Sequence, residues 1–208
     1  MSTLPPLYLI TDRHQVPAGR ELLAVIEELL QAGVRMLQLR EKDLLAAELY
    51  PLAKELRTLT REYDCLLLIN DRVDLALATG ADGVHLGGHS LPLSTVRKLL
   101  GPDKLIGVST HKFQEIPPAA EQGADFVTFG PVFFTASKAA YGAPAGLAKL
   151  QQSCAESPIP VYGLGGINQE NASVVKQAGA HGIALISALL TADNPTTTCQ
   201  KLLKTLNH

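Results

Sequence analysis

The chain has 208 residues, of which 46% are apolar and 18% are charged, so it can bury a substantial core and is not intrinsically disordered. Its 18 Lys and Arg residues nearly balance 20 Asp and Glu residues, for a net charge of −2, and they form no basic stripe. This balance excludes a nucleic-acid-binding protein that relies on bulk positive charge. A site for an anion must therefore be built locally.

Targeting and redox signals are sparse. The three cysteines, Cys65, Cys154 and Cys199, are widely spaced and odd in number, which fits neither a disulfide framework nor a CxxC metal knuckle. The first residues carry no basic segment followed by an apolar stretch, and no apolar run approaches the roughly 20 residues of a membrane helix. We therefore expect a soluble cytoplasmic protein with reduced thiols and no membrane partner.

In chain order, short apolar runs alternate with stretches of helical pattern. The runs lie within LYLI, QAGVRMLQL, LLLI, ATGADGVHL, KLIGV, EQGADFVTF, IPVYGL and QAGAHGIALI. They are continuous rather than strictly alternating, as expected for parallel strands that are covered on both faces. The helical stretches that follow strands include Gly19–Gln31, Leu44–Arg61, Leu91–Leu100, Ile116–Gln122, Gly146–Cys154 and Gln169–Ala178.

Four of these segments share one sequence pattern: a helical stretch ends at a glycine, and an apolar run begins within a few residues. These glycines fit the position just past a helix, where a left-handed backbone favours a residue without Cβ: Gly33, Gly80, Gly123 and Gly179. Eight strand-then-helix units of roughly 25 residues predict a (β/α)8 barrel in a single domain over residues 1–208. A doubly wound open sheet with fewer strands is the main rival.

In such a barrel, chemistry belongs at the carboxyl ends of the strands. The second strand runs directly into Arg40 and Lys42, two cations that can point into one cavity and suit a polyphosphate. The alternative is a solvated charge cluster at a helix start, which the helix dipole opposes. The third strand leads to Asp71, which is either the cap of the following helix or, facing the cations, a Mg²⁺ ligand.

Histidines and a serine follow the fourth strand. His85 and His89 lack metal spacing with any third ligand, so we interpret them as structural or as lining a pocket. Ser90 is predicted to be the N-cap of the next helix. After the sixth strand comes the longest loop, Phe134 to Ala145, whose hydroxyls, lysine and glycine suit a lid that closes over an anion.

The loops after the last two strands are typical of a phosphate site. Gly165 and Gly166 allow close backbone approach after the seventh strand, and Ser187 follows the eighth. A Rossmann site does not fit, because the third glycine of GxGxxG is missing and the segment lies late in the chain. One mouth with a cationic end and a neutral backbone cup fits two phosphorylated substrates, or one bisphosphate.

Six segments resemble the thiamine-phosphate synthase and TenI family in collinear order over nearly the whole chain. They are QLREKD (Gln38–Asp43), LLINDRVDLAL (Leu67–Leu77), GADGVHLG (Gly80–Gly87), IGVSTH (Ile106–His111), GPVFxTxSK (Gly130–Lys138) and GLGGIN (Gly163–Asn168). The resemblance implies a transferase that joins hydroxymethylpyrimidine diphosphate to a thiazole phosphate and releases diphosphate. It also implies small phosphorylated partners; a homodimer stays open.

The resemblance also implies residue roles. The residues expected to hold the pyrimidine diphosphate are Gln38, Arg40, Lys42, Asn70, Ser109 and Lys138, of which Arg40, Lys42, Ser109 and Lys138 form the catalytic set. Asp71 would ligate Mg²⁺, the expected cofactor. The residues expected at the thiazole phosphate, together with Gly165 of the cup, are Thr135, Ser137, Gly166, Ile186 and Ser187.

The chain departs from the family pattern at two informative places. Ser90 stands where the pattern has a second magnesium-binding Asp, and a hydroxyl is a weaker Mg²⁺ ligand than a carboxylate, so a weakened metal site is expected and activity has to be tested. Pro131 stands where a TenI-type tautomerase has a histidine proposed as its acid and base. The alternatives to a synthase are a TenI-type thiazole tautomerase and a non-catalytic, ligand-binding paralogue.

Overall fold

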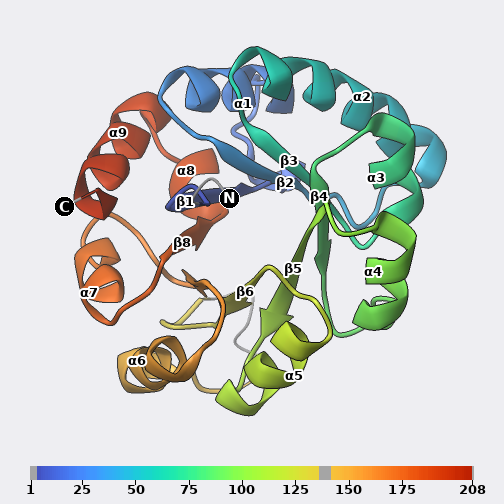
Figure 1. Ribbon diagram of the computed structural model, residues 1–208. Coiled ribbons are helices and arrows are strands. Elements are labelled where there is room, and N and C mark those ends of the chain that lie inside the picture. Colours follow the sequence, from blue (N-terminus) through green and yellow to red (C-terminus); the bar gives the residue numbers. More distant parts are fainter. Residues whose placement is uncertain (1–3, 136–141, 208) are drawn as a thin grey trace.

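A computed structural model describes residues 4–135 and 142–207. Eight parallel strands close into a barrel in chain order, with helices around its outside (Figure 1). The strands are β1 Leu7–Ile10, β2 Met36–Leu39, β3 Leu66–Asn70, β4 Gly83–Leu86, β5 Leu105–Thr110, β6 Phe126–Phe129, β7 Val161–Leu164 and β8 Gly182–Leu185. Pairing of β1 with β8 closes the sheet, which confirms the predicted barrel and excludes the open-sheet rival.

Helices follow the strands as predicted, with shifted ends. The α-helices are α1 Leu22–Gln31, α2 Ala46–Glu62, α3 Val73–Thr79, α4 Leu93–Leu100, α5 Ile116–Glu121, α6 Gly146–Glu156, α7 Ala172–Gln177, α8 Ser187–Leu190 and α9 Pro195–Leu206. Two 3₁₀ turns, Arg13–Gln15 and Phe113–Glu115, follow β1 and β5. Helix α7 begins at Ala172 rather than Gln169, because the side chain of Asn168 accepts from the backbone of Glu170 and Asn171 in a preceding turn.

The barrel interior is filled by side chains, so the barrel is a packed core and not a pore. Residues of six strands form a buried cluster inside the barrel, made up of Tyr8, Ile10, Met36, Leu68, Phe126, Tyr162 and Ala184. A larger apolar layer lies between the strands and the surrounding helices. No helix in the described ranges is long and apolar enough to cross a membrane.

The repeated helix-glycine-strand phrase has a local explanation. All four predicted glycines adopt a positive φ, from 65° to 114°, just at or past a helix end. In the two GAD copies, the aspartate also accepts a backbone N–H from the neighbouring strand and an arginine N–H from the helix before it. The donors are Leu67 and Arg57 for Asp82, and Ile106 and Arg97 for Asp125. Through these hydrogen bonds and ion pairs, Asp82 and Asp125 link helices α2 and α4 to the amino ends of strands.

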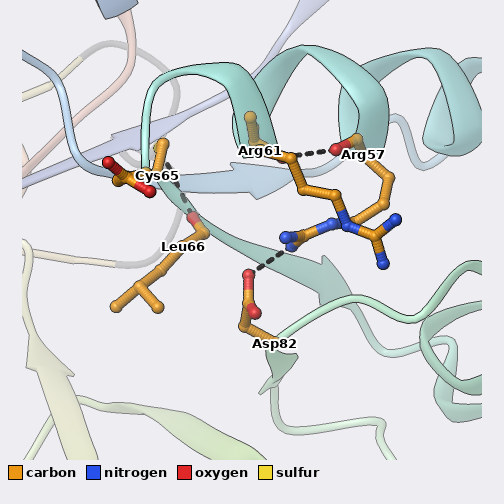
Figure 2. Close-up of a pocket in the computed structure, with 7 residues that line it drawn as sticks. Arg57, Arg61, Cys65, Leu66 and Asp82 are labelled. Atoms are coloured by element: carbon orange, nitrogen blue, oxygen red, sulfur yellow. Dashed lines mark hydrogen bonds and ion pairs between the residues drawn. The ribbon is translucent and has the colours of Figure 1, made fainter.

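A cavity of about 260 Å³ lies beside Asp82, at the amino ends of β3 and β4 (Figure 2). Arg57 spans it to reach Asp82 at 2.5 Å. Cys65 lines the same cavity, and burial raises the pKa of its thiol to about 12, so the thiol stays protonated and unreactive at neutral pH. This end of a barrel ordinarily serves stability, and its residues here do so.

Candidate functional site

Polar side chains from several strands meet at the carboxyl end of the barrel interior. Gln38 lies opposite Ile10 in the β1–β2 register, and Asn70 lies opposite His85 in the β3–β4 register. The side chain of Ser109 on β5 lies 3.0 Å from Nε2 of His85. The structure therefore brings the predicted Gln38, Asn70 and Ser109 to one floor, together with Ile186, which packs against the same interior cluster.

Arg40 and Lys42 follow β2 at this end, and their acidic neighbours Glu41 and Asp43 both pair with Arg13, a residue to which the sequence assigned no role. Arg13 donates to Glu41 at 3.2 Å and forms a two-pronged ion pair with Asp43 at 2.5 and 2.7 Å. Glu41 is only 4% exposed, so its charge is compensated locally. Arg13 thus offsets one of the two negative charges of Glu41 and Asp43, so the segment together with Arg13 carries a net positive charge.

Arg40 interacts with Thr11 through its backbone and with His85 through its charge. The buried hydroxyl of Thr11 accepts the backbone N–H of Arg40 at 2.8 Å, which fixes the backbone where β2 ends. Burial lowers the pKa of His85 to about 3; the charge of Asp71 acts to raise it and the charge of Arg40 to lower it. Both charges therefore act on this one buried ring.

Asp71 is held by two neighbours rather than acting as a helix cap. The hydroxyl of Ser90 donates to Oδ1 and the amide of Asn70 donates to Oδ2 at 2.9 Å, while the N-cap of α3 is Arg72. Asp71 has a φ of 60°, a left-handed backbone that aspartate adopts more readily than most residues. The cap interpretation of Asp71 is therefore wrong.

The N-cap interpretation of Ser90 is also wrong. Helix α4 begins at Leu93 after Pro92, and the Ser90 hydroxyl instead accepts the N–H of Gly87 at 2.6 Å while it donates to Asp71. The loop after β4 thus brings Ser90 to the carboxylate of Asp71, which directly follows β3. His89 on the same loop is exposed, and His85 is buried.

Asp71 fits a Mg²⁺ site in which most of the ligands come from substrate and water. No group of three His, Cys, Asp or Glu side chains suited to a metal occurs in residues 4–135 and 142–207. Magnesium, however, is commonly bound by one or two carboxylates together with substrate phosphates and water. Each Asp71 oxygen accepts one hydrogen bond and retains further acceptor capacity, so this residue fits a site that is completed by a diphosphate.

The Gly165-Gly166 turn follows β7 beside the segment that leaves β6. Gly165 and Gly166 have φ values of 97° and 66°, and a Cβ on Gly166 would lie 2.5 Å from the carbonyl oxygen of Phe134. The N–H of Phe133 donates to the Gly165 carbonyl at 3.0 Å, and the Asn171 amide donates to the Gly166 carbonyl at 2.9 Å. These bonds hold the two carbonyls of the turn to the protein.

The remaining predicted residues are partly covered by the structure. Ser187 is the exposed first residue of α8, directly after Ile186. Because β8 pairs with β7, the two loops predicted to bind a phosphate are neighbours. Thr135 is partly buried at the start of the predicted lid. Ser137 and Lys138 lie outside the described residues.

Known proteins resemble this chain over most of its length. The family profile described as "Thiamine monophosphate synthase" matches residues 7–189. A Geobacter sulfurreducens protein with a provisional thiamine-phosphate synthase name is 54% identical over 200 residues, 96% of this chain and 93% of that protein. Thiamine-phosphate synthase of Clostridium novyi is 44% identical over 188 residues, 90% of this chain and 92% of that protein.

A solved structure agrees with the sequence relatives. Thiamine phosphate pyrophosphorylase from Pyrococcus furiosus superposes with a TM-score of 0.87 at 37% identity, over 97% of this chain and 95% of that one. The family profile, the sequence relatives and the solved structure all cover the barrel and the strand ends described above. The chain belongs to the thiamine monophosphate synthase family.

Proposed function

We propose that the protein transfers the pyrimidinylmethyl group of hydroxymethylpyrimidine diphosphate to the ring nitrogen of a thiazole phosphate, with release of diphosphate. One observation carries the proposal: a cationic segment, a carboxylate and a glycine turn all lie at the carboxyl ends of one closed barrel. Membership of the family agrees with it. The arrangement supplies separate ends for two phosphorylated substrates, as the reaction requires.

The first step breaks the bond between the pyrimidine methylene carbon and the diphosphate oxygen, which keeps the electron pair. Negative charge therefore grows on the leaving diphosphate while a carbocation forms. Arg40 and Lys42, which follow β2 at this end of the barrel, would stabilise this growing charge. Asp71 would hold Mg²⁺, which supplies further charge neutralisation to the diphosphate when bound.

The second step forms the bond between carbon and nitrogen. The lone pair of the thiazole nitrogen attacks the methylene cation, and the product carries the positive charge as a thiazolium. That nitrogen loses no proton, so the site needs charge stabilisation rather than a general base. The Gly165-Gly166 turn and Ser187 would anchor the thiazole phosphate and so hold its nitrogen towards the cation.

The thiazole tautomerase alternative needs a group that moves a proton. Pro131 occupies the position of the proposed acid and base of that branch, and its ring packs against Gly165, where a Cβ would lie 2.7 Å away. No observation here favours this alternative or a non-catalytic role over synthesis.

The decisive assay mixes both substrates with Mg²⁺ and measures thiamine phosphate and diphosphate together. We expect both products in equal amounts, loss of activity in EDTA, and a loss of at least about 100-fold in Arg40→Ala and Lys138→Ala. Lys98→Ala, at an exposed position of α4, is the control that retains activity. Absence of product at saturating substrates overturns the proposal, and deuterium exchange into the thiazole without pyrimidine would indicate the tautomerase.

A further inference from the structure

A chain of four polar side chains runs through the barrel interior towards the floor of the site. The Gln38 amide nitrogen lies 2.8 Å from the Tyr8 hydroxyl, which lies 3.3 Å from Nδ1 of His85. On the other side of the ring, Nε2 lies 3.0 Å from the hydroxyl of Ser109. Tyr8 is 0% and His85 is 3% exposed, whereas Ser109 is half-buried at the carboxyl end of β5.

The donors and acceptors of this chain run in one direction. The Tyr8 oxygen accepts from Gln38, and burial raises the pKa of Tyr8 well above its usual value, so the phenol keeps its proton and can donate it to His85. Nδ1 of His85 is then an acceptor, and the neutral ring must carry its proton on Nε2. That proton points at the Ser109 oxygen, which leaves the serine's own proton to point elsewhere.

Packing fixes the ring in this orientation. His85 lies against Tyr8 and Phe126, with ring centroids 5.8 Å away in both cases. A Cβ at position 107 would lie 2.6 Å from Nδ1 of His85, so Gly107 makes room for the ring. The hydroxyl of Thr128 also lies near Nε2, at 3.5 Å, but the hydroxyl of Ser109 is closer.

We propose that Tyr8 and His85 are positioning residues that aim the hydroxyl proton of Ser109 at an oxygen of the substrate's diphosphate. This rests on the proposed function for the identity of the substrate. The acceptor oxygen gains negative charge as the diphosphate leaves. The hydrogen bond that a correctly directed Ser109 hydroxyl donates to it therefore becomes stronger during the reaction. A serine with a freely rotating hydroxyl would lose part of this stabilisation, since it could turn back towards the ring.

The first test measures the tautomer of His85 in the protein without substrates, by ¹⁵N NMR of the imidazole nitrogens at neutral pH. We expect Nε2–H in the native protein and a change of tautomer population in Tyr8→Phe. Tyr162→Phe is the matched control: it removes a hydroxyl from the same aromatic cluster, but that hydroxyl donates to the Pro5 carbonyl at 2.7 Å. A native Nδ1–H tautomer overturns the proposal without reference to activity.

The second test is a double-mutant cycle on kinetics. We expect Tyr8→Phe and Ser109→Ala each to lower kcat by about tenfold, with KM changed by less than about twofold, and the double variant to lose little more than either one. Tyr162→Phe should retain kcat. If Tyr8→Phe costs the same factor with alanine at position 109 as with serine, its effect does not act through Ser109 and the proposal is wrong.

A third measurement separates this proposal from the proposed function. Calorimetric titration with inorganic diphosphate and Mg²⁺ needs no turnover. We expect Tyr8→Phe to weaken diphosphate binding only where Ser109 is present. A protein that shows the Nε2–H tautomer and this coupling but forms no product would support the positioning of Ser109 and refute the proposed synthase activity. If the native protein does not bind diphosphate, the positioning proposal is wrong.

Discussion

The hydroxyl of Ser90 donates a hydrogen bond to Oδ1 of Asp71, across two loops that follow neighbouring strands of the barrel. The carboxylate is thereby oriented by a neutral group, at the position where the sequence resemblance implies a second acid. A single carboxylate attracts Mg²⁺ less strongly than a pair, so more of the metal's binding must come from the diphosphate. This contact allows us to predict how an aspartate at position 90 would change the magnesium requirement.

Ser90→Asp should lower the Mg²⁺ concentration for half-maximal synthase activity by about tenfold, because two adjacent carboxylates offer the metal a stronger ligand set. The same variant should unfold at a lower temperature in EDTA, since two like charges then face each other without a cation. A magnesium titration of activity and a melting curve measure the two effects. Ser90→Ala is the control, with less than about threefold change in the magnesium requirement. An unchanged requirement in Ser90→Asp would show that position 90 does not reach the metal.

Gly166→Ala should both destabilise the protein and weaken the thiazole phosphate site. The left-handed backbone and the approach of Phe134 O to 2.5 Å from the new Cβ predict a loss of about 1–3 kcal/mol in the free energy of unfolding. Displacement of the turn should raise KM for the thiazole phosphate at least about tenfold. Gly88→Ala is the matched control: its Cβ would have nothing within 4 Å, and we expect less than about 0.5 kcal/mol. Equal effects from the two substitutions would contradict the assignment of the turn.

The barrel was predictable because its signals are local. A glycine that ends a helix and a buried strand after it are both encoded within a few residues, as the positive φ of Gly80 and Gly123 shows. The position of a residue at a strand's end then follows from topology alone, which is why Gln38 and Asn70 could be expected at the carboxyl ends of β2 and β3, where they lie.

The partners within the site were not predictable, since they join distant segments. Arg13 reaches Asp43 over 30 positions and Tyr8 reaches His85 over 77, and neither pair has a spacing that indicates contact. Ser90 looked like a helix cap because serine favours that position, but Pro92 starts the helix later and a tertiary contact takes the hydroxyl.

Arg13→Ala should raise KM for the pyrimidine diphosphate, because Glu41 and Asp43 would then oppose the anion beside Arg40 and Lys42. A rise of about tenfold, with a smaller change in kcat, is expected from steady-state kinetics. Arg20→Ala removes an ion pair with Glu28 on α1 and should leave KM unchanged. A normal KM in Arg13→Ala would mean that the carboxylates do not act on the substrate.

The same variant should change the dependence of stability on pH. Hydrogen bonding from Arg13, and then from His14, holds the pKa of Asp43 well below its usual value. A depressed carboxyl pKa stabilises the fold above the unfolded value, near pH 4, and that stabilisation disappears as pH falls towards the folded value. The difference in unfolding free energy between native protein and Arg13→Ala should therefore be largest above about pH 5 and shrink in acid. Salt should also reduce it, because Asp43 is exposed.

His85 should remain neutral well below the usual range of histidine. Its pKa of about 3 results chiefly from burial, so the ring resonances should stay constant as pH falls from 8 to 4.5 in a carbon-detected NMR titration. The unfolded chain takes up this proton near pH 6.5 while the folded protein does not. His85 thus stabilises the fold fully above pH 6.5, and its contribution declines at up to about 1.4 kcal/mol per pH unit as pH falls towards 3. Resonances that titrate with a midpoint near pH 6.5 would show that the ring is open to water and that the barrel interior is not sealed around it.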